Sequence, residues 1–171
     1  MNISLTTDQV SKRKTIPLGS AEDRANMRVK KRNGNLELVD IIKITKKVAR
    51  CGAGLSFINP YRVASQAISG IYDGVSTTEL DNLLIQTSSL LIGEESEYSK
   101  LASRLLTSFI DKEVSLKKIK SFSSAIPYGH RAGLISDKTA QFVEENSQIL
   151  DQSILEERCD IFEYFGLRTV Y

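Results

Sequence analysis

A basic cluster beside a predicted turn and a predicted helix start is the part of this sequence best suited to bind a ligand. Lys30, Lys31 and Arg32 lead into the turn, and Lys43 lies in the first turn of the helix. A cation at this end of a helix is unusual, because the helix N-terminus already carries partial positive charge. Cations gathered there repel one another unless an anion shares the site, and phosphate groups are the usual anions at helix N-termini. The cluster therefore predicts a site for a phosphate chain.

The turn that presents these cations is the pair Asn33-Gly34. Asn-Gly is the strongest short signal for a two-residue type I′ hairpin turn, because both turn positions need φ > 0. We therefore expect a hairpin over residues 27–40. On its second strand Leu36 and Leu38 alternate with Glu37. Glu37 then points to the opposite face from the leucines and lies beside the side chains of the first strand.

Helical periodicity and capping signals predict four helices after the hairpin. The first runs from about Ile41 to Arg50, and the second begins at Asn59-Pro60, where Asn suits the N-cap and Pro the first helical position. A short strand or extended link at 75–76 precedes the third helix, which begins at a capping box from Ser76 to Glu79. The fourth helix follows Ser96 and runs over 97–114.

Three runs of this sequence resemble, in order and spacing, the ATP-cone, a nucleotide-sensing module at the N-terminus of many ribonucleotide reductase large subunits. They are VKKRNGNLELVDIIKI, YDGVSTTELD and LASRLLTSFIDKE. The resemblance is to the class I large (alpha) subunit, ended before its catalytic barrel. It implies a mainly α (α+β) fold for residues 27–115, in which a four-helix bundle is capped by a small sheet built on the β-hairpin.

The resemblance also implies a site for ATP or dATP as an allosteric effector, together with Mg²⁺. Val29 and Lys30 would offer backbone groups to the adenine, and Glu37 would accept from its exocyclic amine. Around the phosphates the resemblance implies Lys31, Arg32, Lys43 and Lys112. Thr77 and Asp81 would lie beside the sugar, and Asp40 would contact the edge of the base. From local sequence alone, Thr77 and Asp81 are equally ordinary first-turn residues and Lys112 an ordinary complement to a helix C-terminus. Ile42 departs from the family, which often has Asp there.

Residues 116–171 are predicted to begin the next domain. Pro127 and Gly129 interrupt a basic and Ser-rich connection, and we expect them to prevent a regular element there. His130 is expected in that loop as a solvated side chain. A further helix is predicted from Asp137 to Leu150. The last run, DIFEYFGLRTVY, resembles the entry to the reductase catalytic domain.

Composition excludes several other kinds of protein. The net charge of the 171-residue chain is only +2, so no nucleic-acid partner is expected. No apolar run approaches the ~20 residues that span a bilayer, and the N-terminus lacks a secretory signal, so we expect a cytoplasmic protein without a membrane partner. Two cysteines and one histidine cannot form a zinc site, and no metal site in the protein itself is expected. Residues 1–26 are predicted to be a flexible tail.

The resemblance to the ATP-cone implies a regulatory region of ribonucleoside-diphosphate reductase that binds ATP or dATP and controls deoxyribonucleotide synthesis. Its implied partners are the rest of the large subunit, other large subunits and the radical-generating small subunit. No catalytic residue of the family has a matching position, so the chain alone is expected to be inactive. Two alternatives stay open: a transcriptional regulator that joins an ATP-cone to a zinc ribbon, although the paired cysteines are missing, and a helical interaction module without enzymatic function.

Overall fold

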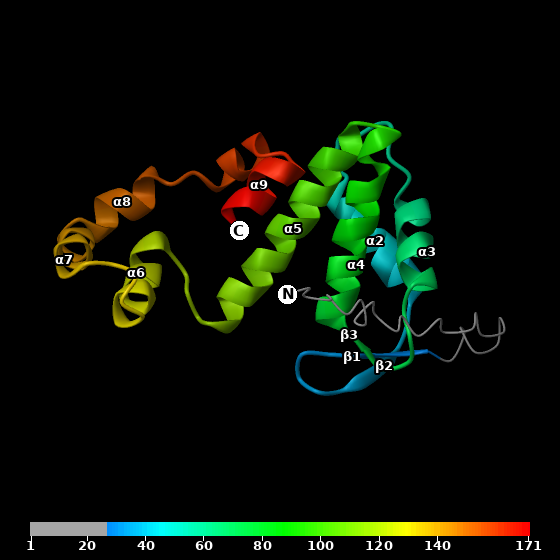
Figure 1. Ribbon diagram of the computed structural model, residues 1–171, viewed down its shortest axis with the longest axis horizontal. Helices are drawn as coiled ribbons and strands as arrows, with labels where there is room; N and C mark the ends of the chain where they lie inside the picture. Colours follow the sequence, from blue (N-terminus) through cyan, green and yellow to red (C-terminus); the bar gives the residue numbers. More distant parts are fainter. Residues whose placement is uncertain (1–26) are drawn as a thin grey trace, which may run out of the picture.

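The computed structural model describes residues 27–171, which form a helical bundle with a small sheet at one end and a helical arm at its side (Figure 1). The predicted tail over residues 1–26 lies outside the described residues. The elements are β1 (Arg28–Lys30), β2 (Leu36–Leu38), α2 (Ile41–Cys51), α3 (Pro60–Ser69), β3 (Val75–Ser76), α4 (Thr77–Leu90), η1 (Leu91–Gly93), α5 (Glu97–Leu116), α6 (Phe122–Arg131), α7 (Asp137–Glu145), α8 (Ser147–Ser153), η2 (Glu156–Ile161) and α9 (Tyr164–Val170). The predicted mainly α fold, with a bundle and a small hairpin-based sheet, is confirmed.

The sheet has the order β2-β1-β3, with β1 antiparallel to β2 and parallel to β3. Val29, in the central strand, is opposite Glu37 on one side and Val75 on the other, and its side chain is buried against the bundle. Asp73 accepts from the backbone N of Arg28 at 2.7 Å and pairs with its guanidinium at 3.2 Å. These contacts hold the hairpin against the start of α4.

The predicted type I′ turn is wrong, and the hairpin has a longer loop. Among the described residues only Lys118 has positive φ without being glycine, so Asn33 does not adopt the conformation that a type I′ turn requires. Instead Gly34 N donates to Lys31 O and Lys31 N donates to Asn35 O, each at 2.8 Å. Gly34, with φ of 88°, alone takes the left-handed position. This is the three-residue hairpin loop with a bulge, in which a glycine takes the single left-handed position.

The helix starts confirm the capping signals. Asn59 caps α3 through a bond from Arg62 N, and Ser76 and Glu79 form the predicted capping box of α4. Ser96 lies at the start of α5 as predicted, although it makes no capping hydrogen bond. Because these caps satisfy backbone N–H groups that the helix leaves unpaired, they fix where each helix begins.

Helices α4 and α5 form the centre of the bundle, with α2 and α3 packed on them (Figure 1). Leu84 of α4 and Leu101 and Leu105 of α5 are at most 1% exposed, as are Val48 of α2 and Val63 of α3. Each fully buried aliphatic side chain of this size contributes about 1.5–3 kcal/mol to stability. The hairpin therefore lies on a closely packed helical core.

The connection after α5 contains a helix, which corrects the prediction that Pro127 and Gly129 prevent a regular element. A capping box between Ser121 and Ser124 starts α6, and Pro127 lies inside it. The helix is tolerated because Asp151 holds its first turn, accepting from Ser123 N at 2.8 Å and from Ser123 Oγ at 2.7 Å. External hydrogen bonds of this kind offset the one intrahelical bond that proline removes.

The arm after residue 131 also differs from the prediction in two places. The single helix predicted from Asp137 to Leu150 is two helices, α7 and α8, which meet at Asn146, where φ of −115° breaks the helical path. His130 is in the last turn of α6 rather than in a loop, and its Nε2 lies 2.7 Å from Asp137 Oδ1. The side chain is therefore paired rather than only solvated.

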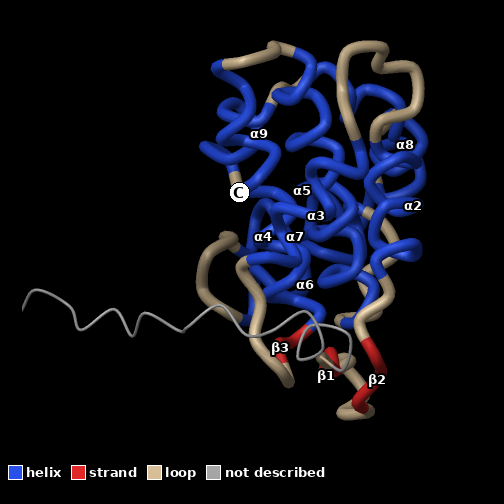
Figure 2. Tube along the Cα trace, turned by 90° about the vertical axis from the view of Figure 1, so that its right-hand side faces the viewer, coloured by secondary structure: helices blue, strands red, loops and turns tan. Residues whose placement is uncertain are grey.

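The last helix, α9, returns to the bundle and packs along α5 (Figures 1 and 2). Ser103 Oγ on α5 donates to Phe162 O at 2.7 Å, and Ser99 Oγ donates to Glu163 Oε2 at 3.2 Å. Tyr164 and Leu167 pack against the bundle core. The first and last parts of the described chain therefore share one core, with α6, α7 and α8 between them in sequence. No helix of residues 27–171 is both long enough and apolar enough to cross a membrane.

Candidate functional site

The strongest polar feature of the described chain is a buried carboxylate held between two lysines. Asp81, in the second turn of α4, has a side chain only 9% exposed. Its Oδ1 pairs with Lys47 Nζ from α2, and its Oδ2 lies 2.8 Å from Lys112 Nζ from α5. A buried carboxylate is stable only when its charge is paired and hydrogen-bonded, and here two helices supply the partners. Three helices therefore converge on one charge cluster.

The two lysines that pair with Asp81 differ in exposure. Lys47 is 17% exposed, whereas Lys112 is 44% exposed. Burial lowers the pKa of Lys47, and the nearby ammonium of Lys112 adds to this effect, against the opposing attraction of Asp81. Lys112 is therefore the more accessible of the two cations, and Lys47 is the more enclosed partner of Asp81.

A pocket of about 320 Å³ opens beside this cluster, between α2 and α5. Its lining consists of Lys47, Arg50, Cys51, Ser108 and Lys112. Three of these side chains are cations and none is an anion, so the pocket favours a negatively charged group. Burial raises the pKa of Cys51, while Lys47, Arg50 and Lys112 oppose that rise. The half-buried thiol is thus a neutral part of a positively charged wall.

The hairpin and the start of α2 add further cations, two of which lie beside a carboxylate. Lys31 Nζ lies 2.5 Å from Glu37 Oε1, and Lys43 Nζ lies 4.0 Å from Asp40 Oδ2. The hydrogen bond from Lys31 lowers the pKa of Glu37, and Lys43 lowers it further, so both lysines lie near the same carboxylate. Asp40 is the N-cap of α2, with bonds to its Oδ1 from Ile42 N at 2.9 Å and Lys43 N at 3.1 Å. Its capping role occupies one of its two carboxylate oxygens.

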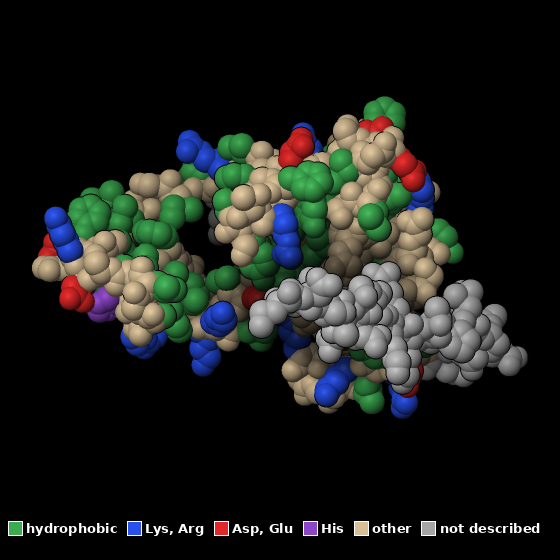
Figure 3. Space-filling model, viewed as in Figure 1, with side chains coloured by type: hydrophobic (Ala, Val, Ile, Leu, Met, Phe, Trp, Pro, Cys, Tyr) green, Lys and Arg blue, Asp and Glu red, His purple; other side chains and the backbone are tan. Residues whose placement is uncertain are grey.

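The hairpin loop reaches α5 through Arg32. Its guanidinium carbon lies 5.9 Å from the centroid of the Phe109 ring, a cation–π contact. Phe109 is one helical turn before Lys112, so the loop lies on the face of α5 that leads to the lysine. Figure 3 shows Lys and Arg side chains around the hairpin and near the C-terminal end of α5. The structure therefore brings Arg32 towards the charge cluster.

The remaining predicted residues line the edge between the sheet and α4. Lys30 is opposite Ser76 in the parallel ladder, which places β1 next to the start of α4. Ser76 and Glu79 form the capping box, so the hydroxyl of Thr77 is not needed for it. Val29 and Lys30 belong to the central strand, where strand pairing on both edges uses much of the backbone hydrogen-bonding capacity. Their predicted backbone contacts with a base stay a prediction.

The sequence reasoning missed Lys47, Arg50, Ser108 and Phe109. Helical spacing could have found them: Lys47 follows Lys43 by one turn, and Ser108 precedes Lys112 by one turn, so each shares a helix face with a predicted residue. Among the described residues, no three His, Cys, Asp or Glu side chains cluster as metal ligands.

Comparison with known proteins gives a consistent result. The family model described as the ATP cone domain matches residues 27–113. The chain is similar to the ribonucleoside-diphosphate reductase large subunit of Caenorhabditis elegans, with 35% identity over 151 residues, which is 83% of this chain and 19% of the relative. It is 34% identical over 155 residues to large chain 2 of Saccharomyces cerevisiae, covering 84% of this chain and 17% of the relative. The large subunit of Vaccinia virus is 34% identical over 153 residues, with 84% and 20% covered. The chain spans about a fifth of the length of these relatives.

Proposed function

This chain belongs to the ATP-cone family, and we propose that its cationic pocket binds ATP and dATP as allosteric effectors of a ribonucleotide reductase. The observation that carries the proposal is the convergence of Lys47, Arg50 and Lys112 on a pocket without acidic lining. Such a pocket suits the triphosphate, the most charged part of the ligand. Lys31 and Lys43 lie near Glu37, and Arg32 lies over Phe109 on α5. In this proposal these three cations reach the phosphates from the hairpin side.

Binding would exchange internal ion pairs for phosphate contacts. Lys31 and Lys112 each have a carboxylate partner in this structure, and their side chains are both 44% exposed. Ion pairs of lysines at such exposure contribute at most about 1 kcal/mol, so exchanging them for contacts with a triphosphate, which carries more negative charge than one carboxylate, costs little. Phosphate oxygens can therefore replace these partners favourably. Lys47 would continue to neutralise Asp81 when the nucleotide is bound, and we therefore add Lys47 to the site.

The base and the sugar would lie on the sheet side of the phosphates. When Lys31 turns to the phosphates, Glu37 becomes available to accept from the exocyclic amine of adenine. Guanine has a carbonyl oxygen at that ring position, so Glu37 would discriminate against GTP. Thr77 and Asp81, at the start of α4, are the residues proposed to face the sugar. ATP and dATP differ by one ribose hydroxyl and can shift an equilibrium only by their difference in affinity for its states.

Mg²⁺, if it accompanies the nucleotide, would be held by the phosphates and water. The described residues offer no cluster of carboxylates for it, and Mg²⁺ commonly binds through substrate phosphates while keeping several waters. The residues present therefore fit a metal that arrives with the nucleotide rather than one resident in the protein.

The similarity to reductase subunits extends beyond the cone, and this favours the reductase over an ATP-cone transcriptional regulator. The match to the Caenorhabditis elegans protein covers 83% of the chain, whereas the cone model ends at residue 113. We propose that residues 27–115 form the effector domain and 116–171 begin the following domain. The partners would be the rest of the large subunit, other large subunits and the radical-generating small subunit, and the 171-residue chain alone would have no reductase activity.

Titration calorimetry with ATP, dATP and GTP tests the proposal. We expect ATP and dATP to bind, GTP to bind more weakly, and Lys112→Ala to reduce ATP affinity. Lys100→Ala is the matched control, because Lys100 is an exposed lysine on the same helix, away from the pocket. A ligand at 100 times its Kd stabilises the folded state by about 2.7 kcal/mol, so the melting temperature should rise with ATP. Absence of heat and of thermal shift with both adenine nucleotides would refute the proposed function.

A further inference from the structure

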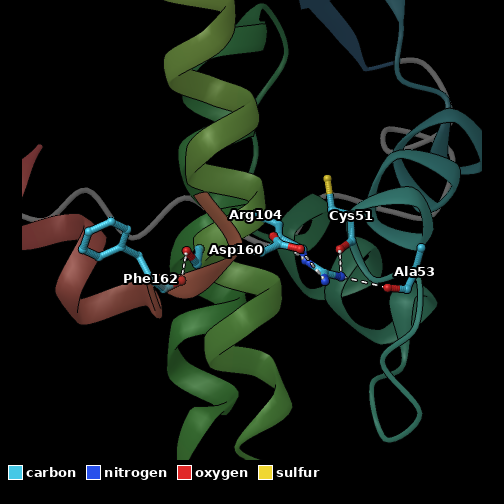
Figure 4. A network of polar contacts seen from close by, with 6 residues as sticks. Cys51, Ala53, Arg104, Asp160 and Phe162 are labelled. Carbon is cyan, nitrogen blue, oxygen red and sulfur yellow. Dashed lines mark hydrogen bonds and ion pairs between the residues drawn. The ribbon is translucent and has the colours of Figure 1, made fainter. Parts of the chain in front are cut away.

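Arg104, on α5, joins three parts of the chain through one guanidinium. Its Nη1 donates to Cys51 O at 3.2 Å and to Ala53 O at 2.8 Å, where α2 ends. Its Nε and Nη2 donate to Asp160 Oδ1 at 3.1 Å and Oδ2 at 3.0 Å. Figure 4 shows the side chain between the end of α2 and the segment that leads to α9. Arg104 therefore connects the last part of the described chain to α2.

These bonds bear on the width of the cationic pocket. Lys47, Arg50 and Cys51 form the wall contributed by α2, and Ser108 and Lys112 form the wall contributed by α5. Arg104 is one helical turn before Ser108 and holds the end of α2 by its carbonyls. The guanidinium is planar and its donors are fixed in direction, so Arg104 ties the end of α2 to α5 in one defined orientation. Asp160, by accepting two of its bonds, fixes that orientation.

A second contact links the same C-terminal segment to the hairpin. Tyr171 packs edge-to-face on Phe109, with ring centroids 6.4 Å apart and planes at 85°. The guanidinium of Arg32 lies over that same Phe109 ring. Tyr171 OH also donates to Glu113 Oε2 at 3.3 Å. One aromatic ring thus contacts both the hairpin loop and the end of the described chain.

We propose that Arg104 and Asp160 are positioning residues of the nucleotide site, and that the segment 160–171 belongs to the nucleotide-binding unit. This inference rests on the proposed function. It extends the unit beyond residues 27–113, which the family model matches, to a segment that lies in the sequence range proposed above for the following domain. By linkage, the effect is reciprocal: if docking of 160–171 raises affinity for the nucleotide, then the nucleotide stabilises docking of 160–171 by the same factor. Neither residue lines the pocket, so both act through α2 and α5.

The first test measures ATP affinity of Asp160→Asn by titration calorimetry. Asn keeps the shape but accepts through one oxygen and lacks the charge, so Arg104 is held less firmly. We expect ATP affinity to fall about fivefold, the lower end of typical coupling, because Asp160 is 58% exposed. Arg104→Lys should weaken binding as well, since an ammonium on a flexible chain cannot serve α2 and Asp160 in one fixed plane. Glu144→Gln, which makes the same change in net charge on exposed α7, should leave affinity unchanged.

The second test needs no nucleotide and separates this inference from the proposed function. In a Cys159→Ser background, Cys51 is the remaining cysteine, and its rate of reaction with a thiol reagent reports how tightly α2 is held against α5. Asp160→Asn and Arg104→Lys should each raise that rate, whereas Glu144→Gln should not. Far-UV dichroism checks that each variant is folded. If ATP fails to bind the parent chain, the proposed function fails, while a raised Cys51 rate still supports the positioning role. Unchanged Cys51 rates in both variants would overturn it, and so, where ATP binds, would unchanged ATP affinities in both variants.

Discussion

Removing Lys47 and Lys112 together should destabilise the fold by about 1–2 kcal/mol more than the sum of the two single changes. Asp81 is buried and accepts from both lysines. Lys112→Ala leaves Lys47 as a partner, and because Lys112 is 44% exposed, its contribution is about 1 kcal/mol or less. Lys47→Ala removes the more buried partner but also removes the cost of desolvating Lys47, so we expect a loss of about 1–2 kcal/mol.

The double variant leaves a buried carboxylate without a partner, which typically costs about 3–5 kcal/mol. The excess over the sum of the single losses should be about 1–2 kcal/mol, within the range of coupled neighbours. Urea unfolding followed by far-UV dichroism measures each value, with equal m-values as the check that the denatured state is unchanged. Asp81→Asn in the double variant should restore much of the loss, since a neutral amide does not need a cation.

A matched pair of controls uses the exposed lysines of the same two helices. Lys46→Ala on α2 and Lys100→Ala on α5 should each change the free energy of unfolding by no more than about 0.5 kcal/mol and should be additive. If Lys47→Ala and Lys112→Ala are also additive, or if Asp81→Asn does not rescue the double variant, then Asp81 is solvated and the charge cluster does not hold the three helices together.

Three further outcomes are expected. Lys31→Ala should weaken ATP binding about tenfold in calorimetry, while Lys30→Ala, at the adjacent end of β1 but predicted to contribute its backbone, should not. Equal losses would remove Lys31 from the site. Gly34→Ala should lower the free energy of unfolding, measured in urea, by about 1–2 kcal/mol, because Gly34 has φ of 88°. A Cβ at Gly34 would meet no atom within 4 Å, so the loss would come from the backbone conformation and not from a clash. An unchanged free energy of unfolding would contradict the bulged loop. Hydrogen bonds from Ser76 and Tyr72 hold the pKa of Glu79 below its ordinary value of 4.5. Glu79 therefore stabilises the folded state above pH 4.5, and this stabilisation is lost as the pH falls through the pKa of the folded state. Glu79→Gln should therefore show a smaller fall in melting temperature than the parent between about pH 6 and pH 3.

The helices of the bundle could be predicted because their signals are local. A capping box or an Asn-Pro pair satisfies backbone groups within a few residues, so Ser76 and Asn59 mark helix starts whatever lies around them. The hairpin was predictable in place but not in loop type. Asn33-Gly34 allows either a two-residue turn or a three-residue loop with one left-handed glycine, and pairing of Lys31 with Asn35 selects the second.

Features that depend on distant partners could not be predicted. Pro127 is tolerated in α6 because Asp151, in α8, holds the first turn of that helix. No local sequence pattern indicates this hydrogen bond. The site shows the same limit. Lys47 is one of several lysines along α2, and only the fold places Asp81 of α4 beside it. Its spacing from Lys43 indicated a shared helix face but not a buried partner.

The pairing of the site cations changes the physical account of how a nucleotide would act. From sequence, cations gathered near a helix start are expected to repel one another until an anion arrives. In the structure Lys31 lies by Glu37, Lys43 by Asp40, and Lys112 by Asp81. A triphosphate would therefore compete with carboxylates of the protein, and its net gain is the difference between two sets of ion pairs rather than the full phosphate interaction. ATP and dATP meet this competition equally, so one ribose hydroxyl changes the outcome only through the difference in affinity that it makes between the states. Replacing such a carboxylate by its amide, as in Glu37→Gln, removes competition for the phosphates but also weakens the acceptor for the adenine amine. Inorganic triphosphate should then bind more tightly while ATP loses its advantage over GTP, and calorimetry with all three ligands separates the two effects.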